Sequence, residues 1–170
     1  MYHGTDNKSA AEIYAEGINV RCGKRGTDFG LGFYTTDDYD RAVRRAIQKA
    51  ELRGYSPAVV KMYFDEATAE PIIERFEDDL RWGRFVINNR NGRGYVEKVP
   101  FKEHNLDARY QITIGRIADL NVFQIAQKLN KEGKLLESID NILNLKYPQQ
   151  IVFHTQYAVK YVKNISYQRL

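Results

Sequence analysis

The sequence is poor in the residues that build disulfides and metal centres. Its one cysteine, Cys22, cannot close a disulfide within the chain, which indicates a reducing compartment. The three histidines, His3, His104 and His154, are scattered, whereas a structural zinc site usually takes roughly four nitrogen or sulfur ligands at short paired spacings. We therefore expect no metal site.

The chain also lacks long apolar runs. No apolar stretch approaches the roughly 18 residues that a membrane-spanning helix needs. The chain does not open on a basic segment followed by an apolar one, so no secretory leader is expected. These two absences predict a cytoplasmic protein with no membrane partner.

The length and the composition are those of one globular domain. A chain of 170 residues, 43% of them hydrophobic, is long enough to bury a core. We expect a single domain over residues 1–170. The formal net charge of +4 permits an acidic partner, such as nucleic acid or an acidic protein, without requiring one.

Short strands alternate with amphipathic helices along the chain. Alternating or turn-bounded apolar runs predict strands at 2–4, 33–36, 57–64, 109–115, 149–155 and 163–170. Apolar residues at helical spacing predict helices at 7–17, 37–54, 71–87, 119–133, 134–145 and 156–162. Ser9 is the expected N-cap of the first helix and Gly17 its stop, as Asp119 and Gly133 are for the fourth. The sum predicts an α+β fold in which helices are inserted between short strands.

Four glycines, Gly23, Gly26, Gly30 and Gly32, crowd the loop before residue 33. Their spacing matches neither the phosphate loop of nucleoside triphosphatases nor the dinucleotide-binding fingerprint. Bare backbone at a strand edge would let a flat ligand come close, and a plain mobile loop is the alternative. The sequence leaves both interpretations open.

Several other residues have simple structural interpretations. Cys22 has no histidine partner nearby in the sequence, which favours an exposed thiol without a catalytic role. Trp82 and Phe85, three residues apart in an expected helix, favour core packing. Arg90 and Asp119 are a candidate internal ion pair, with a role in a binding site as the alternative.

Three ordered segments carry a family resemblance: YHGT at 2–5, GLGFYTT at 30–36 and YPQQIVF at 147–153. They resemble the signature segments of ADP-ribosyltransferases of the diphtheria-toxin and poly(ADP-ribose) polymerase type. More narrowly, the chain resembles a bacterial family of small ADP-ribosyltransferase-like proteins. That family also has a Trp-x-x-Phe-x-x-x-x-Arg segment and an Ile-Gly-x-x-Ala-Asp segment, which here end at Arg90 and Asp119 and include Gly115 and Ala118. The resemblance implies a split β core of short strands.

The resemblance also implies roles in binding NAD for residues of the first two segments. His3 would hydrogen-bond a ribose hydroxyl, and the backbone of Gly4 would pair with the carboxamide. Tyr34 would stack on the nicotinamide ring, beside Phe33. Thr5 and Arg21 are candidate contacts to the far ribose and the pyrophosphate.

The third signature position departs from the active polymerases. Gln149 or Gln150 stands where they have a glutamate, and only one of the two can face the ligand because successive strand residues point to opposite faces. A glutamine can accept a hydrogen bond but offers no negative charge and no base. Ala42 also replaces a serine of the polymerases. Single transfer of ADP-ribose is therefore favoured over chain elongation.

The expected function is mono-ADP-ribosylation with NAD as substrate. The resemblance implies the toxin of a bacterial toxin–antitoxin or phage-defence system, which modifies a protein or a nucleic acid, releases nicotinamide and is restrained by an inhibitory antitoxin. One alternative is a non-catalytic module that binds NAD or ADP-ribose. Another is a nucleic-acid-modifying enzyme, which is favoured by the basic residues Arg21, Lys24, Arg25, Arg41, Arg44, Arg45 and Lys49.

Overall fold

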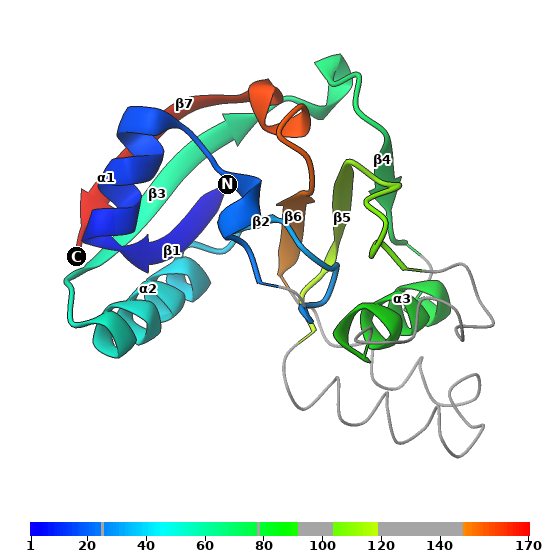
Figure 1. Ribbon diagram of the computed structural model, residues 1–170, viewed down its shortest axis with the longest axis horizontal. Coiled ribbons are helices and arrows are strands. Elements are labelled where there is room, and N and C mark those ends of the chain that lie inside the picture. The colour runs from blue at the N-terminus through cyan, green and yellow to red at the C-terminus, as the bar shows by residue number, and fades with distance from the viewer. Residues whose placement is uncertain (25, 78, 92–103, 119–147) are drawn as a thin grey trace.

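Figure 1 shows the protein as a computed structural model, which describes residues 1–24, 26–77, 79–91, 104–118 and 148–170. The strands are β1 (Tyr2–Asp6), β2 (Phe33–Thr36), β3 (Pro57–Phe64), β4 (Ile73–Arg75), β5 (Ile112–Arg116), β6 (Gln149–Phe153) and β7 (Val162–Arg169). The helices are α1 (Asn7–Glu16), α2 (Tyr39–Arg53) and α3 (Asp79–Asn91), and short 3-10 helices lie at Val20–Cys22, Glu66–Thr68 and Ala158–Tyr161.

All of these strands join one mixed sheet in the order β4-β5-β6-β2-β1-β3-β7. Only the edge pair β4 and β5 is parallel, and the other neighbouring strands run antiparallel. The expected α+β fold is confirmed. Because β1 and β2 lie side by side at the middle of the sheet, the first two signature segments of the sequence are brought together.

The pairing register assigns side chains to two faces of the sheet, because residues that pair across neighbouring strands project to the same side. Tyr2 pairs with Thr36, and Gln150 pairs with both Thr36 and Gly115. These positions share the side that we call the α2/α3 face. The other side, which α1 covers, is called the α1 face.

Helices α2 and α3 both approach their face of the sheet at a glycine. A Cβ atom on Gly4 would overlap the backbone carbonyl of Ala42 in α2. A Cβ atom on Gly115 would come within 3.4 Å of Trp82 in α3. In Figure 1 both helices lie below the sheet, α2 under β1 and α3 near β5. Gly4 is therefore required by packing, whatever its backbone does for a ligand.

Among the described residues, the largest hydrophobic core lies on the α1 face. Ala10 of α1 is fully buried there against strand residues that include Phe33, Val60 and Phe153. A second core lies under α3, where Phe29, Phe76, Trp82, Phe85 and Val152 are buried. The interpretation of Trp82 and Phe85 as core residues is confirmed.

Helix α1 has a different N-cap from the one that the sequence pattern predicts. Asp6, rather than Ser9, is the N-cap, and its carboxylate accepts from the Ser9 N–H at 2.8 Å and the Ser9 hydroxyl at 3.0 Å. Aspartate and serine are equally good N-caps. Because β1 ends at Asp6, the strand pairing selects Asp6 over Ser9 as the cap. Gly17 ends the helix as expected, with φ of 87°.

The expected helix over 71–87 is wrong in its first part. Residues Ile73–Arg75 form β4, which adds to the sheet edge beside β5, and the helix follows at Asp79–Asn91. The Phe76 N–H also donates to the Ile114 carbonyl at 2.8 Å. Ile73 and Phe76 suit a short strand as well as a helix, and pairing with an available sheet edge overrides local preference.

The remaining expectations divide into three groups. The strands expected near 2–4, 33–36, 57–64, 109–115, 149–155 and 163–170 and the helix near 37–54 are confirmed, whereas 156–162 holds a 3-10 helix. The helices expected at 119–133 and 134–145, with Asp119 and Gly133, lie outside the described residues. No helix of the described segments is long and apolar enough to cross a membrane.

Candidate functional site

The antiparallel ladder between β1 and β2 contains a single pair, Tyr2 with Thr36. On its other edge β1 pairs with β3 along its whole length. Continuing the first register would place Gly4 opposite Tyr34, but no pair between described residues forms there. The strands thus separate after one pair. We call this region, formed by His3, Gly4, Phe33, Tyr34 and Lys49, the β1–β2 junction.

The peptide groups of Gly4 point into the junction. In an antiparallel strand, alternate residues direct both their N–H and their C=O toward the same neighbouring strand. The Met62 N–H donates to the Met1 carbonyl at 3.0 Å and the Asn7 N–H to the Ser56 carbonyl at 2.8 Å, so odd residues of this segment face β3. Gly4, an even residue, therefore faces the side where β2 separates, with one donor and one acceptor.

The ring of His3 lies where the ladder would continue. Its Nδ1 is 2.6 Å from the Tyr34 carbonyl oxygen. A carbonyl only accepts, so Nδ1 carries the proton and Nε2 is left as an acceptor. The ring stacks on Phe33 with centroids 4.4 Å apart. The imidazole is therefore held in one tautomer and one orientation.

Lys49 of α2 reaches the acceptor nitrogen of this ring, with its Nζ 3.4 Å from Nε2 of His3. Burial and then the Lys49 charge lower the pKa of His3 to about 3, so the imidazole is neutral near pH 7. Burial, followed by the charges of Arg45 and Arg53, lowers the pKa of Lys49 to about 8. His3 therefore contacts Phe33 on the α1 face and Lys49 of α2 on the α2/α3 face. Its ring thus lies between β1 and β2.

Tyr34 uses its hydroxyl within the glycine-rich loop. The hydroxyl accepts from the Phe29 N–H at 2.9 Å and lies 2.7 Å from both the Thr27 hydroxyl and the Gly30 carbonyl. Burial raises the pKa of this hydroxyl well above its usual value. The tether gives residues 27–30 a defined conformation, with Gly30 at φ of 85°. Only the half-buried ring of Tyr34 is left to meet a ligand.

A buried carboxylate, Asp28, is the centre of a second group of polar side chains. Arg90 Nε donates to Asp28 Oδ1 at 2.6 Å, and a terminal nitrogen of Arg90 pairs with the same oxygen. The Ala118 N–H and Gln150 Nε2 donate to Oδ2 at 3.0 and 3.1 Å. We call Asp28, Arg90, Ala118 and Gln150 the Asp28 cluster. Arg90 thus forms an internal ion pair with Asp28, whereas the pairing expected between Arg90 and Asp119 is not tested, because Asp119 lies outside the described residues.

The two glutamines of the third segment differ sharply in environment. Gln150 is 4% exposed, shares a face with Tyr34, and donates both to Asp28 and to the Arg116 carbonyl, the latter at 3.1 Å. Gln149 is exposed on the opposite face. A glutamate at position 150 could not donate to Asp28 and would place a second negative charge beside it. This contact gives a physical reason for glutamine at that position.

The remaining predicted site residues are not all close to the junction surface. Gly4 and Phe33 belong to the junction. Thr5 is 2% exposed, so its side chain does not face solvent. Arg21 is exposed in the 3-10 helix Val20–Cys22. Cys22 is an exposed free thiol, as expected.

Sequence reasoning missed two residues that the structure makes central. Lys49 was considered only as one of several helix bases, although its spacing of four residues from Arg45 and Arg53 places all three along one side of α2. Asp28 lies within the glycine-rich loop, and the sequence pattern assigns it no role. Its buried partners come from positions 90, 118 and 150, which no local pattern connects.

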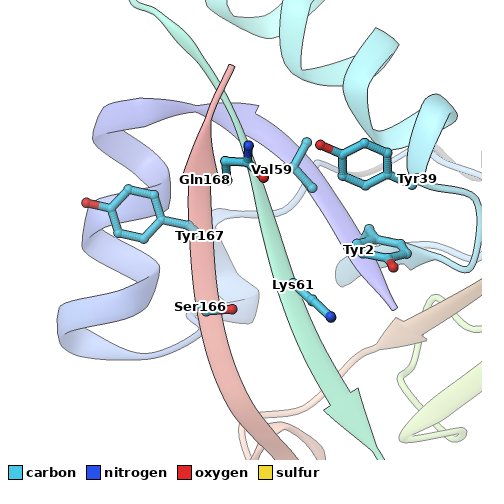
Figure 2. Close-up of a pocket in the computed structure, with 7 residues that line it drawn as sticks. All are labelled: Tyr2, Tyr39, Val59, Lys61, Ser166, Tyr167 and Gln168. Carbon is cyan, nitrogen blue, oxygen red and sulfur yellow. The ribbon is translucent and has the colours of Figure 1, made fainter.

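A shallow depression of about 130 Å³ lies beside the junction, on the α2/α3 face of β1, β3 and β7. Figure 2 shows its lining, with Tyr2 and Tyr39 on one side and Lys61 and Gln168 on the strands. The Tyr2 and Tyr39 rings meet edge to face, 5.3 Å apart. It contains none of the predicted catalytic residues.

Comparisons with known proteins identify a family but no individual relative. No curated protein and no solved structure matches the chain. A family model described as "Protein of unknown function (DUF3990)" matches residues 1–164, almost the whole chain. The chain therefore belongs to the DUF3990 family.

Proposed function

We propose that this protein is an NAD-dependent mono-ADP-ribosyltransferase whose nicotinamide site is the β1–β2 junction. The observation that carries the proposal is the state of His3. Its Nδ1–H is bound to the Tyr34 carbonyl, which leaves Nε2 as an acceptor of fixed orientation at the junction.

The groups at the junction fit the nicotinamide half of NAD. A carboxamide needs one donor and one acceptor, and Gly4 directs one of each toward the junction. A ribose hydroxyl can donate to Nε2 of His3, and the ring face of Tyr34 suits stacking against a flat ring. NAD supplies nicotinamide as a leaving group on an electrophilic ribose carbon, and the reaction replaces that bond by a bond to an acceptor that loses a proton.

This chain's residues would orient NAD without supplying a base. His3 is neutral near pH 7, and Gln150 has its amide nitrogen committed to Asp28 and the Arg116 carbonyl. Fixed dipoles and a held geometry stabilise a transition state with developing positive charge on the ribose. We therefore expect single transfer to an acceptor that is already nucleophilic.

The test uses purified protein, labelled NAD and cell lysate. We expect nicotinamide release and a labelled macromolecule, which separate protease and nuclease treatments then assign to protein or nucleic acid. His3→Ala and Tyr34→Leu should abolish labelling. Tyr34→Phe keeps the ring and should keep NAD binding. Absence of both label and nicotinamide with the wild-type protein would overturn the proposal.

A second candidate, a non-catalytic module that binds NAD or ADP-ribose, is favoured by the closed contacts of Gln150. With no carboxylate at the third position, binding without turnover is chemically reasonable. Saturable binding of NAD by the wild-type protein, with no nicotinamide released in lysate, would select this module.

The basic side of α2 favours a nucleic acid as acceptor. Arg41, Arg44, Arg45, Lys49 and Arg53 all lie on this one helix. Phosphate contacts make nucleic-acid binding steeply dependent on salt, which distinguishes this acceptor from a protein. The family resemblance further supports a toxin restrained by an inhibitory partner, for which loss of toxicity in His3→Ala is the test.

A further inference from the structure

We propose that Lys49, with Arg45, binds the pyrophosphate of NAD, and that in the free protein Lys49 occupies the hydrogen-bonding position on His3 that the ribose takes in the complex. This inference rests on the proposed function, since it names a subsite of the same site. It adds a residue from α2 that neither the sequence motifs nor the family assigns.

The contacts of Lys49 are unusual for a half-buried cation. Its ammonium lies against a neutral imidazole nitrogen at 3.4 Å, and within the described parts of the chain it forms no ion pair with a carboxylate. Buried cations are generally paired with an anion. A half-buried ammonium that has no such anion in the described parts of the chain is suited to bind an anionic group of a ligand.

The charges that face Lys49 from the surrounding elements are mostly positive. Arg45 and Arg53 come from α2 itself, and Lys24 comes from the glycine-rich loop. The facing carboxylate is Asp6 of β1, which is already engaged by Arg53 at 2.9 Å and by Ser9. A doubly charged pyrophosphate beside Lys49 and Arg45 would offset this excess of positive charge.

The contact between Lys49 and His3 couples the two halves of the ligand. A ribose hydroxyl can donate to Nε2 of His3 only after Lys49 has moved away, because both compete for one lone pair. The long side chain of lysine can swing from that nitrogen to a nearby phosphate without movement of the helix. Pyrophosphate binding therefore frees His3 for the nicotinamide ribose.

The test measures the dissociation constants of NAD, ADP-ribose and nicotinamide riboside, which lacks phosphate. For Lys49→Met we expect at least about tenfold weaker binding of NAD and ADP-ribose, the loss typical of a charged hydrogen bond. Binding of nicotinamide riboside should stay equal or become tighter, because its competitor for His3 is gone. Lys49→Arg should retain most of the affinity for NAD.

Lys163→Met is the control, since it removes one positive charge from an exposed position of β7, a strand separated from β2 by β3 and β1 in the sheet. Its affinities should stay within about twofold for all three ligands, as for exposed charges that make no direct contact. Thermal unfolding of each variant checks that the fold is retained, with Lys49→Gln as a second variant if Lys49→Met unfolds. Wild-type affinity for NAD in a folded Lys49→Met, or an equal loss for nicotinamide riboside, would overturn the inference alone. Failure of the wild-type protein to bind NAD and ADP-ribose would overturn the proposed function with it.

Discussion

The Asp28 cluster and the β1–β2 junction both hold charged side chains that are at least half buried, but only the charges of the Asp28 cluster are balanced. In the Asp28 cluster a buried carboxylate meets a guanidinium, a peptide N–H and an amide, so each charge has its counterpart. In the junction a lysine ammonium meets a neutral histidine. The Asp28 cluster is therefore structural, because the chain itself pairs its charges. The junction carries a positive charge that an anionic ligand would pair with.

The largest effect is expected when the balanced cluster is broken. Asp28→Asn keeps the shape of the side chain but removes the buried negative charge that pairs with Arg90, which should lower the free energy of unfolding by about 3–5 kcal/mol. Urea denaturation measures the loss. Asp107→Asn is the control, because Asp107 pairs with Arg109 at the surface, where such pairs contribute about 0–1 kcal/mol. Equal losses in the two variants would remove the structural role of the Asp28 cluster.

Acid should destabilise the protein through His154, a buried histidine outside the junction. The Nδ1–H of His154 donates to the Leu31 carbonyl at 2.7 Å, and its Nε2 is 2.8 Å from the Thr113 hydroxyl. Burial lowers the pKa of His154 to about 4. Below pH 6.5 the unfolded chain takes up a proton that the folded chain does not, so stability falls between about pH 6.5 and 4, by about 2 kcal/mol per such histidine at pH 5.

Unfolding measured from pH 8 to pH 4 should therefore become less pH-dependent in His154→Gln. Part of the dependence should remain, because His3 has its pKa lowered to about 3 and titrates in the same direction. An unchanged slope in His154→Gln would show that His154 is not held neutral in the folded state.

A smaller effect should distinguish the two glutamines of β6. Gln150→Ala removes two donated hydrogen bonds, one of them to the buried Asp28 carboxylate, which should cost about 2 kcal/mol of stability. Gln149→Ala, at an exposed position, should change stability by less than about 0.5 kcal/mol. Chemical denaturation of the pair checks this. If only Gln149→Ala lost nicotinamide release, the third site position would belong to Gln149.

The smallest effect is expected at the junction itself. Lys49→Met removes a positive charge from His3 and should raise the pKa of its imidazole, which stays below the usual value because burial is the larger cause. The pKa of His154 should not change, which provides an internal control. Histidine titration by NMR measures both. An unchanged pKa of His3 would contradict the contact with Lys49.

The sequence predicted the elements better than the connections between them. Most strands and α2 follow from alternation and helical spacing, whereas the adjacency of the strands at YHG and FYTT comes from the sheet order. β4 was missed because Ile73 and Phe76 suit either period, and only the open edge of β5 decides for a strand. The N-cap of α1 was misplaced because Asp6 and Ser9 are both good caps.

The site was predictable only where one segment carries the information. His3, Gly4 and Tyr34 were identified from their motifs, but Lys49 was not, because its contact with His3 spans 46 residues. The contact of Arg90 with Asp28, which spans 62 residues, was not predicted. The predicted pairing of Arg90 with Asp119 lies outside the described residues.

The sequence by itself determined the α+β class, most helix and strand positions and the residue types at the junction, because these depend on periodicity and local chemistry. Only the tertiary structure decided which charges are balanced. Pairing of charges depends on which distant side chains share a buried space, and burial sets the energetic cost of leaving one unpaired. Asp28, whose charge is paired, therefore has a structural role, whereas Lys49 belongs to the candidate ligand site.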